Sequence, residues 1–298
     1  MFRVKDLTRS YLSHLDVRVK LGEIEPATKS WYKSQLDKLD VACGEYPAAD
    51  LRAPHLVAVD FTYHFVRALK ALYRWAVDEE QQLVPRDPFK KLKAPPCGER
   101  QRILTRAEMR SLYLASGRQL RRLLFLLRHT VARPGEIRRL TWGLIQWDRR
   151  MILWTKFKGK KRRGDGVKVR TIPLDLPAVR LLRNLYRRRG SPGPNEPVWL
   201  DRDGKELSPN GLRCRMRLAR LKAGLNPEDI EERIVCYTLR HTAATDAVRA
   251  GVRGKQLSNI MGHARSATTD RYVHLAGDDL VEGIDRLAAA RPRRRSSG

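Results

Sequence analysis

Apolar residues recur at helical spacing along the first hundred residues. In residues 63–77 they return at intervals of three and four, the pattern of a helix that buries one face; the apolar positions there are Phe65, Leu69, Leu72, Tyr73 and Ala76. Turn signals separate this segment from two further helical patterns, over residues 7–19 and 28–39. The pattern predicts an all-helical N-terminal module.

Proline interrupts the helical periodicity after this module. The four prolines are Pro85, Pro88, Pro95 and Pro96, and Cys97-Gly98 follows the last of them. Such a stretch is typical of a linker between domains. We therefore place a domain boundary near Gly98.

The second half alternates helical patterns with a few short strands. Thr105 precedes Glu108 by three residues, a capping-box pattern that predicts a helix start. An apolar helix over 120–127 ends near Arg133-Pro134, where proline can open the next helix. Further strands are predicted over 151–154, 167–174 and 198–200, and further helices over 209–223, 239–250, 255–261 and 279–289. The fold class is mainly α with a small antiparallel β-sheet.

Composition points to a polyanionic partner. Lys and Arg outnumber Asp and Glu by 61 to 33, a formal net charge of +28. A compact fold with this charge repels itself unless a polyanion binds it, and nucleic acid is the expected partner. The sequence contains no apolar run long enough to span a membrane, and its first residues lack a signal-peptide pattern. We expect a cytoplasmic protein without a membrane partner.

The sequence predicts neither a metal site nor a cofactor. Cys43, Cys97, Cys214 and Cys236 are scattered, with no Cys-x-x-Cys pair, so we expect free thiols. The seven histidines form no set with metal-ligand spacing, and no phosphate-binding glycine loop is present. Any chemistry must therefore be carried by side chains.

Four residues form an ordered set suited to phosphodiester cleavage. Arg133 lies in Ala132-Arg133-Pro134-Gly135-Glu136, and Arg240 lies in Tyr237-Thr238-Leu239-Arg240-His241-Thr242. His263 follows Gly262, and Tyr272 comes nine residues later. A guanidinium donates bidentately to phosphate, and a phenol can form a reversible covalent bond to it. Among 61 basic residues a single arginine means little, so the ordered set carries the inference.

This set resembles the active site of the tyrosine recombinase, or phage integrase, family. The resemblance implies a SAM-like helical core-binding domain that binds DNA, with its linker, in residues 1–98, and a catalytic domain in 99–290. Residues 291–298, which have no apolar residue, are expected to form a basic disordered tail. The implied activity is site-specific cleavage and rejoining of DNA strands through a 3′-phosphotyrosyl intermediate. Arg133 and Arg240 would then clamp the phosphate, His263 would donate a hydrogen bond to it, and Tyr272 would be the nucleophile.

The family also places a general-acid lysine on a β-hairpin. Lys156 fits this position best, with Lys158 as the alternative. The remaining basic residues of the loop are expected to contact DNA phosphates together with Lys158; they are Lys160, Lys161, Arg162 and Arg163.

Two further positions qualify the resemblance. Glu136, three residues after Arg133, is predicted to orient that arginine or a neighbouring donor in a supporting role. Tyr237 occupies the position where the family usually has histidine. A phenol can donate a hydrogen bond to phosphate but is a poor base near neutral pH, because its ordinary pKa is about 10.

The resemblance implies partners as well. Double-stranded DNA is the expected substrate, bound by a homotetramer in the synaptic complex, with a monomer or weak dimer free in solution and a nucleoid-associated location. The apolar stripe of residues 279–289 either docks on a neighbouring protomer or packs on its own domain. Two alternatives stay open: a catalytically impaired DNA-binding protein that keeps the fold, and a type IB topoisomerase-like enzyme that relaxes DNA without synapsis. Integrase, resolvase and transposon roles are not separated by the sequence.

Overall fold

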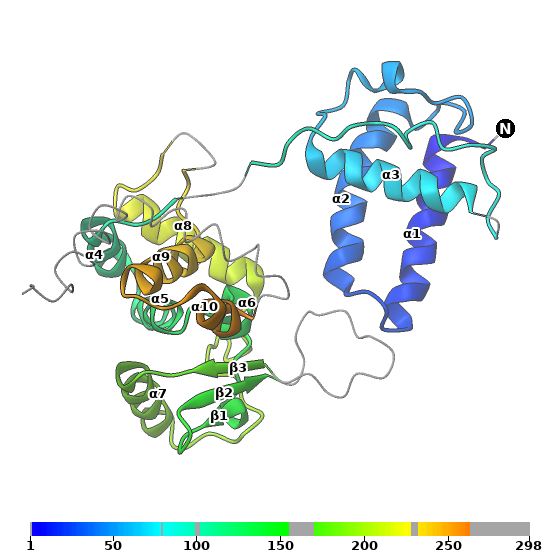
Figure 1. Cartoon of the computed structure of the whole chain (residues 1–298). Coiled ribbons are helices and arrows are strands. Elements are labelled where there is room, and N and C mark those ends of the chain that lie inside the picture. The colour runs from blue at the N-terminus through cyan, green and yellow to red at the C-terminus, as the bar shows by residue number, and fades with distance from the viewer. Residues whose placement is uncertain (1, 79, 99–101, 155–169, 228–231, 263–298) are drawn as a thin grey trace, which may run out of the picture. The chain divides into compact units, whose positions relative to one another are not determined.

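The computed structural model describes residues 2–78, 80–98, 102–154, 170–227 and 232–262. The chain divides into two compact units, Met1–Gly98 and Glu99–Gly298 (Figure 1). Each unit has its own hydrophobic core.

The N-terminal unit consists of three α-helices and one short 3-10 helix. The helices α1 (Val4–Lys20) and α2 (Pro26–Cys43) lie side by side, and α3 (Tyr63–Val77) packs against both (Figure 1). Thr62 caps α3, because its hydroxyl accepts a hydrogen bond from the N–H of Phe65 (3.2 Å). The 3-10 helix Ala53–Leu56 lies in the connection between α2 and α3.

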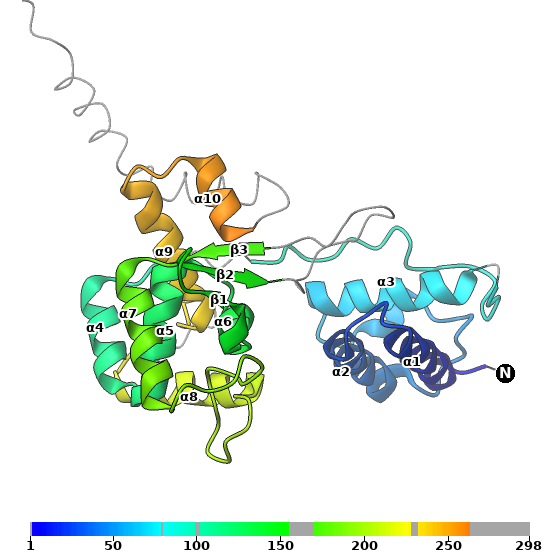
Figure 2. The same ribbon diagram turned by 90° about the horizontal axis from the view of Figure 1, so that it is seen from below.

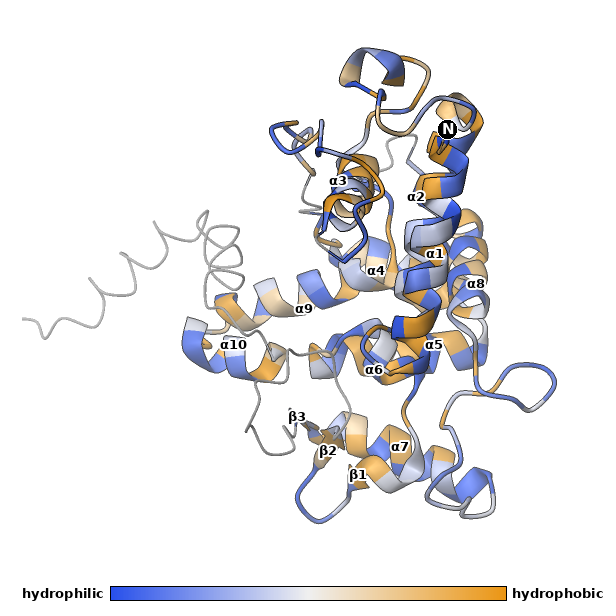
Figure 3. Ribbon diagram, turned by 90° about the vertical axis from the view of Figure 1, so that its right-hand side faces the viewer, coloured by the Kyte–Doolittle hydropathy of each residue, from blue (hydrophilic) through white to orange (hydrophobic). Residues whose placement is uncertain are grey.

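The second unit is built around α5 (Arg118–Thr130). Its leucines at positions 120, 123, 124, 126 and 127 are all buried. Five helices pack against α5: α4 (Arg106–Ala115), α6 (Pro134–Arg138), α7 (Leu176–Arg188), α8 (Pro209–Lys222) and α9 (Cys236–Arg249). Each helix carries both apolar and polar residues along its length (Figure 3). The short helix α10 (Gly254–Met261) packs against α9 and β3.

A three-stranded antiparallel sheet completes this unit. Its strands are β1 (Ile145–Gln146), β2 (Met151–Trp154) and β3 (Arg170–Pro173), in the order β1-β2-β3 (Figure 2). Trp154 pairs with Arg170, and Ile152 pairs with Ile172. Side chains alternate between the two faces of a strand, so Arg170 shares the buried face of β3 with Ile172.

The predicted fold class is confirmed, with two corrections. Residues 198–200 are not a strand; this region makes only isolated bridges, including Leu200 with Glu206, and the third strand is Ile145–Gln146. The helix α7 was not predicted, although Asp175 caps it and Val179, Leu182 and Leu185 are spaced by three. The predicted terminal helix 279–289 and the tail 291–298 lie outside the described residues.

None of the helices in the described ranges is long and apolar enough to cross a membrane.

The central position of α5 predicts a large effect of truncating its core. Leu124 is fully buried, so Leu124→Ala should lower the free energy of unfolding by about 2–5 kcal/mol through lost burial and cavity formation. Leu114→Ala is the matched control, because Leu114 on α4 is 67% exposed, and a change within about 0.5 kcal/mol is expected there. Urea unfolding followed by circular dichroism measures both. Equal losses would contradict the central role of α5.

Candidate active site

Glu136 lies buried at the start of α6 and binds Arg133 twice. One carboxylate oxygen, Oε2, accepts a hydrogen bond from the backbone N–H of Arg133 (2.9 Å). The other, Oε1, accepts one from Arg133 Nη1 (3.0 Å). Proline at the first position of α6 and glutamate at the third are residues that favour a helix start. The local sequence thus fixes the carboxylate beside the guanidinium.

A second arginine reaches the same carboxylate from the sheet. Arg170 Nε lies 2.8 Å from Glu136 Oε1 and forms an ion pair with it. The Arg170 side chain is 3% exposed. Burial lowers the pKa of Arg170, and the charge of Glu136 opposes that shift. The buried carboxylate therefore compensates for the burial of this cation.

Sequence reasoning missed Arg170. The signal that could have found it is the alternation of β3, which puts residue 170 on the same face as the core residue Ile172. A charged residue at a position that the strand pattern assigns to the core requires a buried partner, and Glu136 is that partner.

Arg240 comes from α9 and is held by two backbone carbonyls. Its Nη1 donates to the carbonyl of Val131 (2.6 Å), and its Nη2 donates to that of Met261 (3.0 Å). Val131 follows α5 in the left-handed region, with φ of 51°, which is costly for a β-branched residue. This backbone conformation accompanies a carbonyl directed at Arg240, which is 2% exposed.

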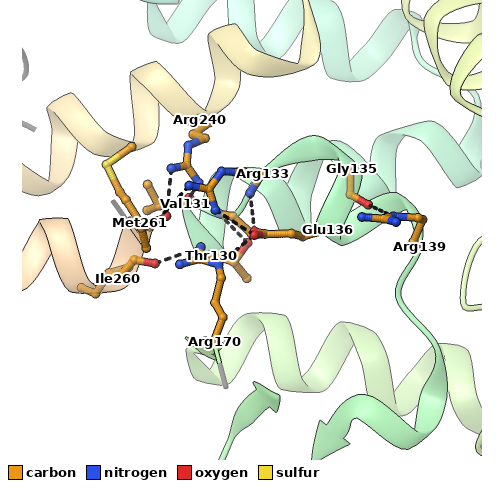
Figure 4. A network of polar contacts seen from close by, with 12 residues as sticks. Thr130, Val131, Arg133, Gly135, Glu136, Arg139, Arg170, Arg240, Ile260 and Met261 are labelled. Atoms are coloured by element: carbon orange, nitrogen blue, oxygen red, sulfur yellow. Dashed lines mark hydrogen bonds and ion pairs between the residues drawn. The ribbon is translucent and has the colours of Figure 1, made fainter. Parts of the chain in front are cut away.

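The three arginines meet at the C-terminal end of α10 (Figure 4). Besides the bond from Arg240 to Met261, Arg170 Nη2 donates to the carbonyl of Ile260 (3.2 Å) and Arg133 Nη2 to that of Gly262 (2.9 Å). Carbonyls at a helix C-terminus lack partners within the helix and carry partial negative charge, so cations stabilise them. Three guanidinium groups, from β3, α9 and the segment before α6, thus donate hydrogen bonds to three successive carbonyls.

Gly262 is required at this point for two reasons. Its φ is +64°, a conformation that glycine adopts readily. A Cβ atom at this position would also overlap Arg170 Nη1. The chain therefore turns tightly over the buried guanidinium immediately before His263.

Tyr237 lies in the first turn of α9, three residues before Arg240. Its side chain is 48% exposed, and its ring centroid lies 6.5 Å from that of His241. Residues three apart on a helix share a face. Tyr237 thus presents an accessible phenol on the side of α9 that carries Arg240.

The other candidates lie outside the described residues. They are the general-acid candidates Lys156 and Lys158, the loop residues Lys160, Lys161, Arg162 and Arg163, the candidate hydrogen-bond donor His263 and the candidate nucleophile Tyr272.

The cysteines are free, as predicted. Cys236 is adjacent to Tyr237 on α9, and burial raises the pKa of its thiol to about 12. At neutral pH the group is therefore a protonated thiol, which is a poor nucleophile.

Comparison with known proteins identifies the family of this chain. The sequence profile of the Phage integrase family matches residues 102–278, more than half of the chain. The chain belongs to the phage integrase family. The tyrosine recombinase XerC of Pseudomonas putida KT2440 is 25% identical to it over 99% of both chains. This integrase-family chain is a tyrosine-type site-specific DNA recombinase, and the findings favour that activity over a non-catalytic DNA-binding role.

Solved structures share the fold. The Tn1549 transposon integrase, solved in complex with a circular intermediate DNA, has a TM-score of 0.70 and 19% identity, over 96% of this chain and all of that one. A λ integrase tetramer bound to a Holliday junction has a TM-score of 0.68 and 18% identity, over 89% of this chain and 79% of that one. Integrase-family proteins of low sequence identity thus share the helical architecture described above.

Removal of the Glu136 carboxylate should destabilise the protein strongly. Glu136→Ala leaves Arg170 charged and buried without its anionic partner, so we expect a loss of about 3–5 kcal/mol in the free energy of unfolding. Glu206→Ala is the control, because Glu206 pairs with Arg138 (2.6 Å) with its side chain 46% exposed; about 0–1 kcal/mol is expected there. Denaturant unfolding compares the two. A Glu136 loss no larger than the Glu206 loss would show that the buried pair is not needed.

Proposed function

We propose that this recombinase cleaves one DNA strand with Tyr272. The phenolic oxygen attacks the scissile phosphorus and releases its proton to water, a 3′-phosphotyrosyl bond forms, and the bond to the 5′-oxygen of the next nucleotide breaks. Lys156, with Lys158 as the alternative, gives that leaving oxygen its proton. Attack of a 5′-hydroxyl from the partner strand on the phosphotyrosyl bond reverses these steps and rejoins the DNA.

Arg133 and Arg240 are proposed to bind the non-bridging oxygens of the scissile phosphate. The observation that carries this proposal is that the two guanidinium groups donate to adjacent carbonyls, Gly262 and Met261, and therefore lie side by side. His263 is the next residue in the chain. Fixed guanidinium groups stabilise negative charge as it develops on a phosphate, without reorganising during the reaction. A guanidinium offers five N–H donors, enough to serve both a carbonyl and a phosphate.

The charges of this cluster suit that reaction. Arg133, Arg170 and Arg240 contribute three positive charges and Glu136 one negative charge, so these four side chains sum to +2. A five-coordinate phosphorus with two non-bridging oxygens carries about two negative charges in the transition state. Glu136 is proposed to support Arg133 and not to transfer a proton.

The two units are proposed to share DNA binding unequally. Residues 99–298 carry a net charge of +25 (45 Lys and Arg against 20 Asp and Glu), and residues 1–98 carry +3 (16 against 13). Counterion release therefore favours the catalytic unit as the main source of affinity for the DNA backbone. The basic loop contributes through Lys158, Lys160, Lys161, Arg162 and Arg163. Residues 1–98 are proposed to be the core-binding domain, 99–290 the catalytic domain and 291–298 a basic tail.

The proposed assembly is a homotetramer on two DNA sites, formed from monomers or weak dimers. The λ integrase structure, which is a tetramer on a Holliday junction, supports this proposal. We place the protein in the cytoplasm, on the nucleoid. A type IB topoisomerase-like enzyme would share the chemistry but would not transfer strands between two duplexes, so a strand-transfer assay separates the two functions.

The covalent step can be tested without knowing the target in advance. A randomised duplex library with strand nicks is incubated with the protein, and denaturant-resistant adducts are isolated and sequenced to recover the site. We expect the wild-type protein to form an adduct and Tyr272→Phe to form none while binding DNA with unchanged affinity, since only the nucleophilic oxygen is removed. Mapping of the DNA to any other tyrosine would refute the assignment.

Tyr237 is proposed to donate a hydrogen bond to the phosphate. Tyr237→Phe removes that donor and keeps the ring, so cleavage of the recovered site should slow by about 10-fold or somewhat more, the scale of a hydrogen bond to a charged group. Single-turnover adduct formation measures the rate constant. Tyr237→His, which restores the usual family residue, should retain activity. A Phe variant as fast as the wild type would mean that the phenol hydroxyl has no part in cleavage.

A further inference from the structure

Arg170 lies outside the two sequence motifs that carry the candidate clamp arginines. Its side chain is 3% exposed, against 30% for Arg133, and Arg240 is buried to a similar degree. Its Nε and Nη1 are buried and make no hydrogen bond in the described part of the chain, although Nε forms the ion pair with Glu136, and Nη1 lies directly beneath the tight turn at Gly262. Its contacts are made to Glu136 and to the end of α10, so the role that they support passes through these neighbours.

Those neighbours are Glu136 and Ile260, which adjoin the proposed phosphate clamp of Arg133 and Arg240. Through Nε, Arg170 holds Glu136 Oε1, the oxygen that also accepts from Arg133 Nη1. Through Nη2, it holds the carbonyl of Ile260, two residues before Gly262. One side chain thus contacts both the carboxylate that holds Arg133 and the end of α10.

We infer that Arg170 is a positioning residue for cleavage: it fixes Glu136 against Arg133 and anchors the end of α10 that leads into His263. This inference rests on the proposed phosphate clamp of Arg133 and Arg240. A side chain that served only to fill the core would be apolar at this position, because a buried cation is costly unless it is paired. The geometry requires arginine in particular, because its fork serves a carboxylate and a carbonyl in two fixed directions, whereas the lysine ammonium is a single point charge.

Arg170→Lys tests the inference, since it keeps the charge and removes the fork. On the DNA site recovered with the wild-type protein, we expect the single-turnover cleavage rate at saturating protein to fall by about 10- to 100-fold, while the Kd for DNA changes less than about 2-fold. Arg189→Lys is the matched control. Arg189 Nη1 also donates to backbone carbonyls, those of Pro197 (2.8 Å) and Val198 (3.2 Å), but these belong to a different region of the same unit; its cleavage rate should stay within about 2-fold of the wild type.

A second substrate distinguishes positioning from general destabilisation. In a methylphosphonate duplex, a neutral methyl group replaces one non-bridging oxygen of the scissile phosphate, so less charge needs to be stabilised in the transition state. If Arg170 aligns the clamp, the ratio of wild-type to Arg170→Lys rates should shrink on this substrate to about 3 or less. A variant that is merely unstable would keep the same ratio on both substrates, and that result would overturn the inference.

A double-mutant cycle tests the route through Glu136. If Arg170 acts through this carboxylate, Glu136→Gln combined with Arg170→Lys should be no slower than the slower single variant, whereas independent effects would multiply.

Arg170→Met, which fits the buried space without charge, replaces the lysine variant if that variant does not fold. Absence of any adduct with the wild-type protein would refute the proposed function. A wild type that cleaves and an Arg170 variant that cleaves equally fast would refute only the positioning role.

Discussion

The arginine cluster of the second unit is organised around one buried carboxylate. Glu136 receives Arg133 from its own helix start and Arg170 from the sheet, both on the same oxygen. Two guanidinium groups side by side repel each other, and burial strengthens that repulsion because the dielectric is low. A single anion between them makes the arrangement stable. This pairing joins β3 to α6, and hydrogen bonds from Arg170 and Arg133 join both to the end of α10.

The end of α10 joins a third arginine to that pairing. The last carbonyls of a helix carry partial negative charge and need donors. Here Ile260, Met261 and Gly262 find theirs in Arg170, Arg240 and Arg133. The same contacts that satisfy the helix end bring together positive charges from α9, β3 and the segment before α6. The side chains that satisfy the helix end are thus the same ones that concentrate positive charge there.

The sequence predicted those parts that depend on local pattern. The helix Tyr63–Val77 and the strand Met151–Trp154 have their predicted bounds, because periodicity and capping residues mark them. The strand Ile145–Gln146 has only two residues, too few for a pattern, and the three-residue spacing within α7 is obscured by arginines on its exposed face. In the site, motifs singled out Arg133, Glu136 and Arg240. Arg170 was not found, since its burial depends on Glu136 and Ile260, which are 34 residues before it and 90 residues after it.

The positive charges of residues 99–298 are of two kinds, and the two kinds act differently. Most of the net charge of +25 in residues 99–298 attracts the DNA backbone without regard to sequence, and individual residues contribute small, nearly interchangeable amounts to affinity. The three arginines at α10 are the opposite case, because each has fixed partners and Arg170 and Arg240 are almost fully buried. In the proposed reaction their value lies in direction and not in number, since a fixed cation acts on charge that develops only in the transition state. Composition can therefore indicate that the chain binds a polyanion, whereas only the tertiary structure reveals which of its many arginines are held together by fixed partners.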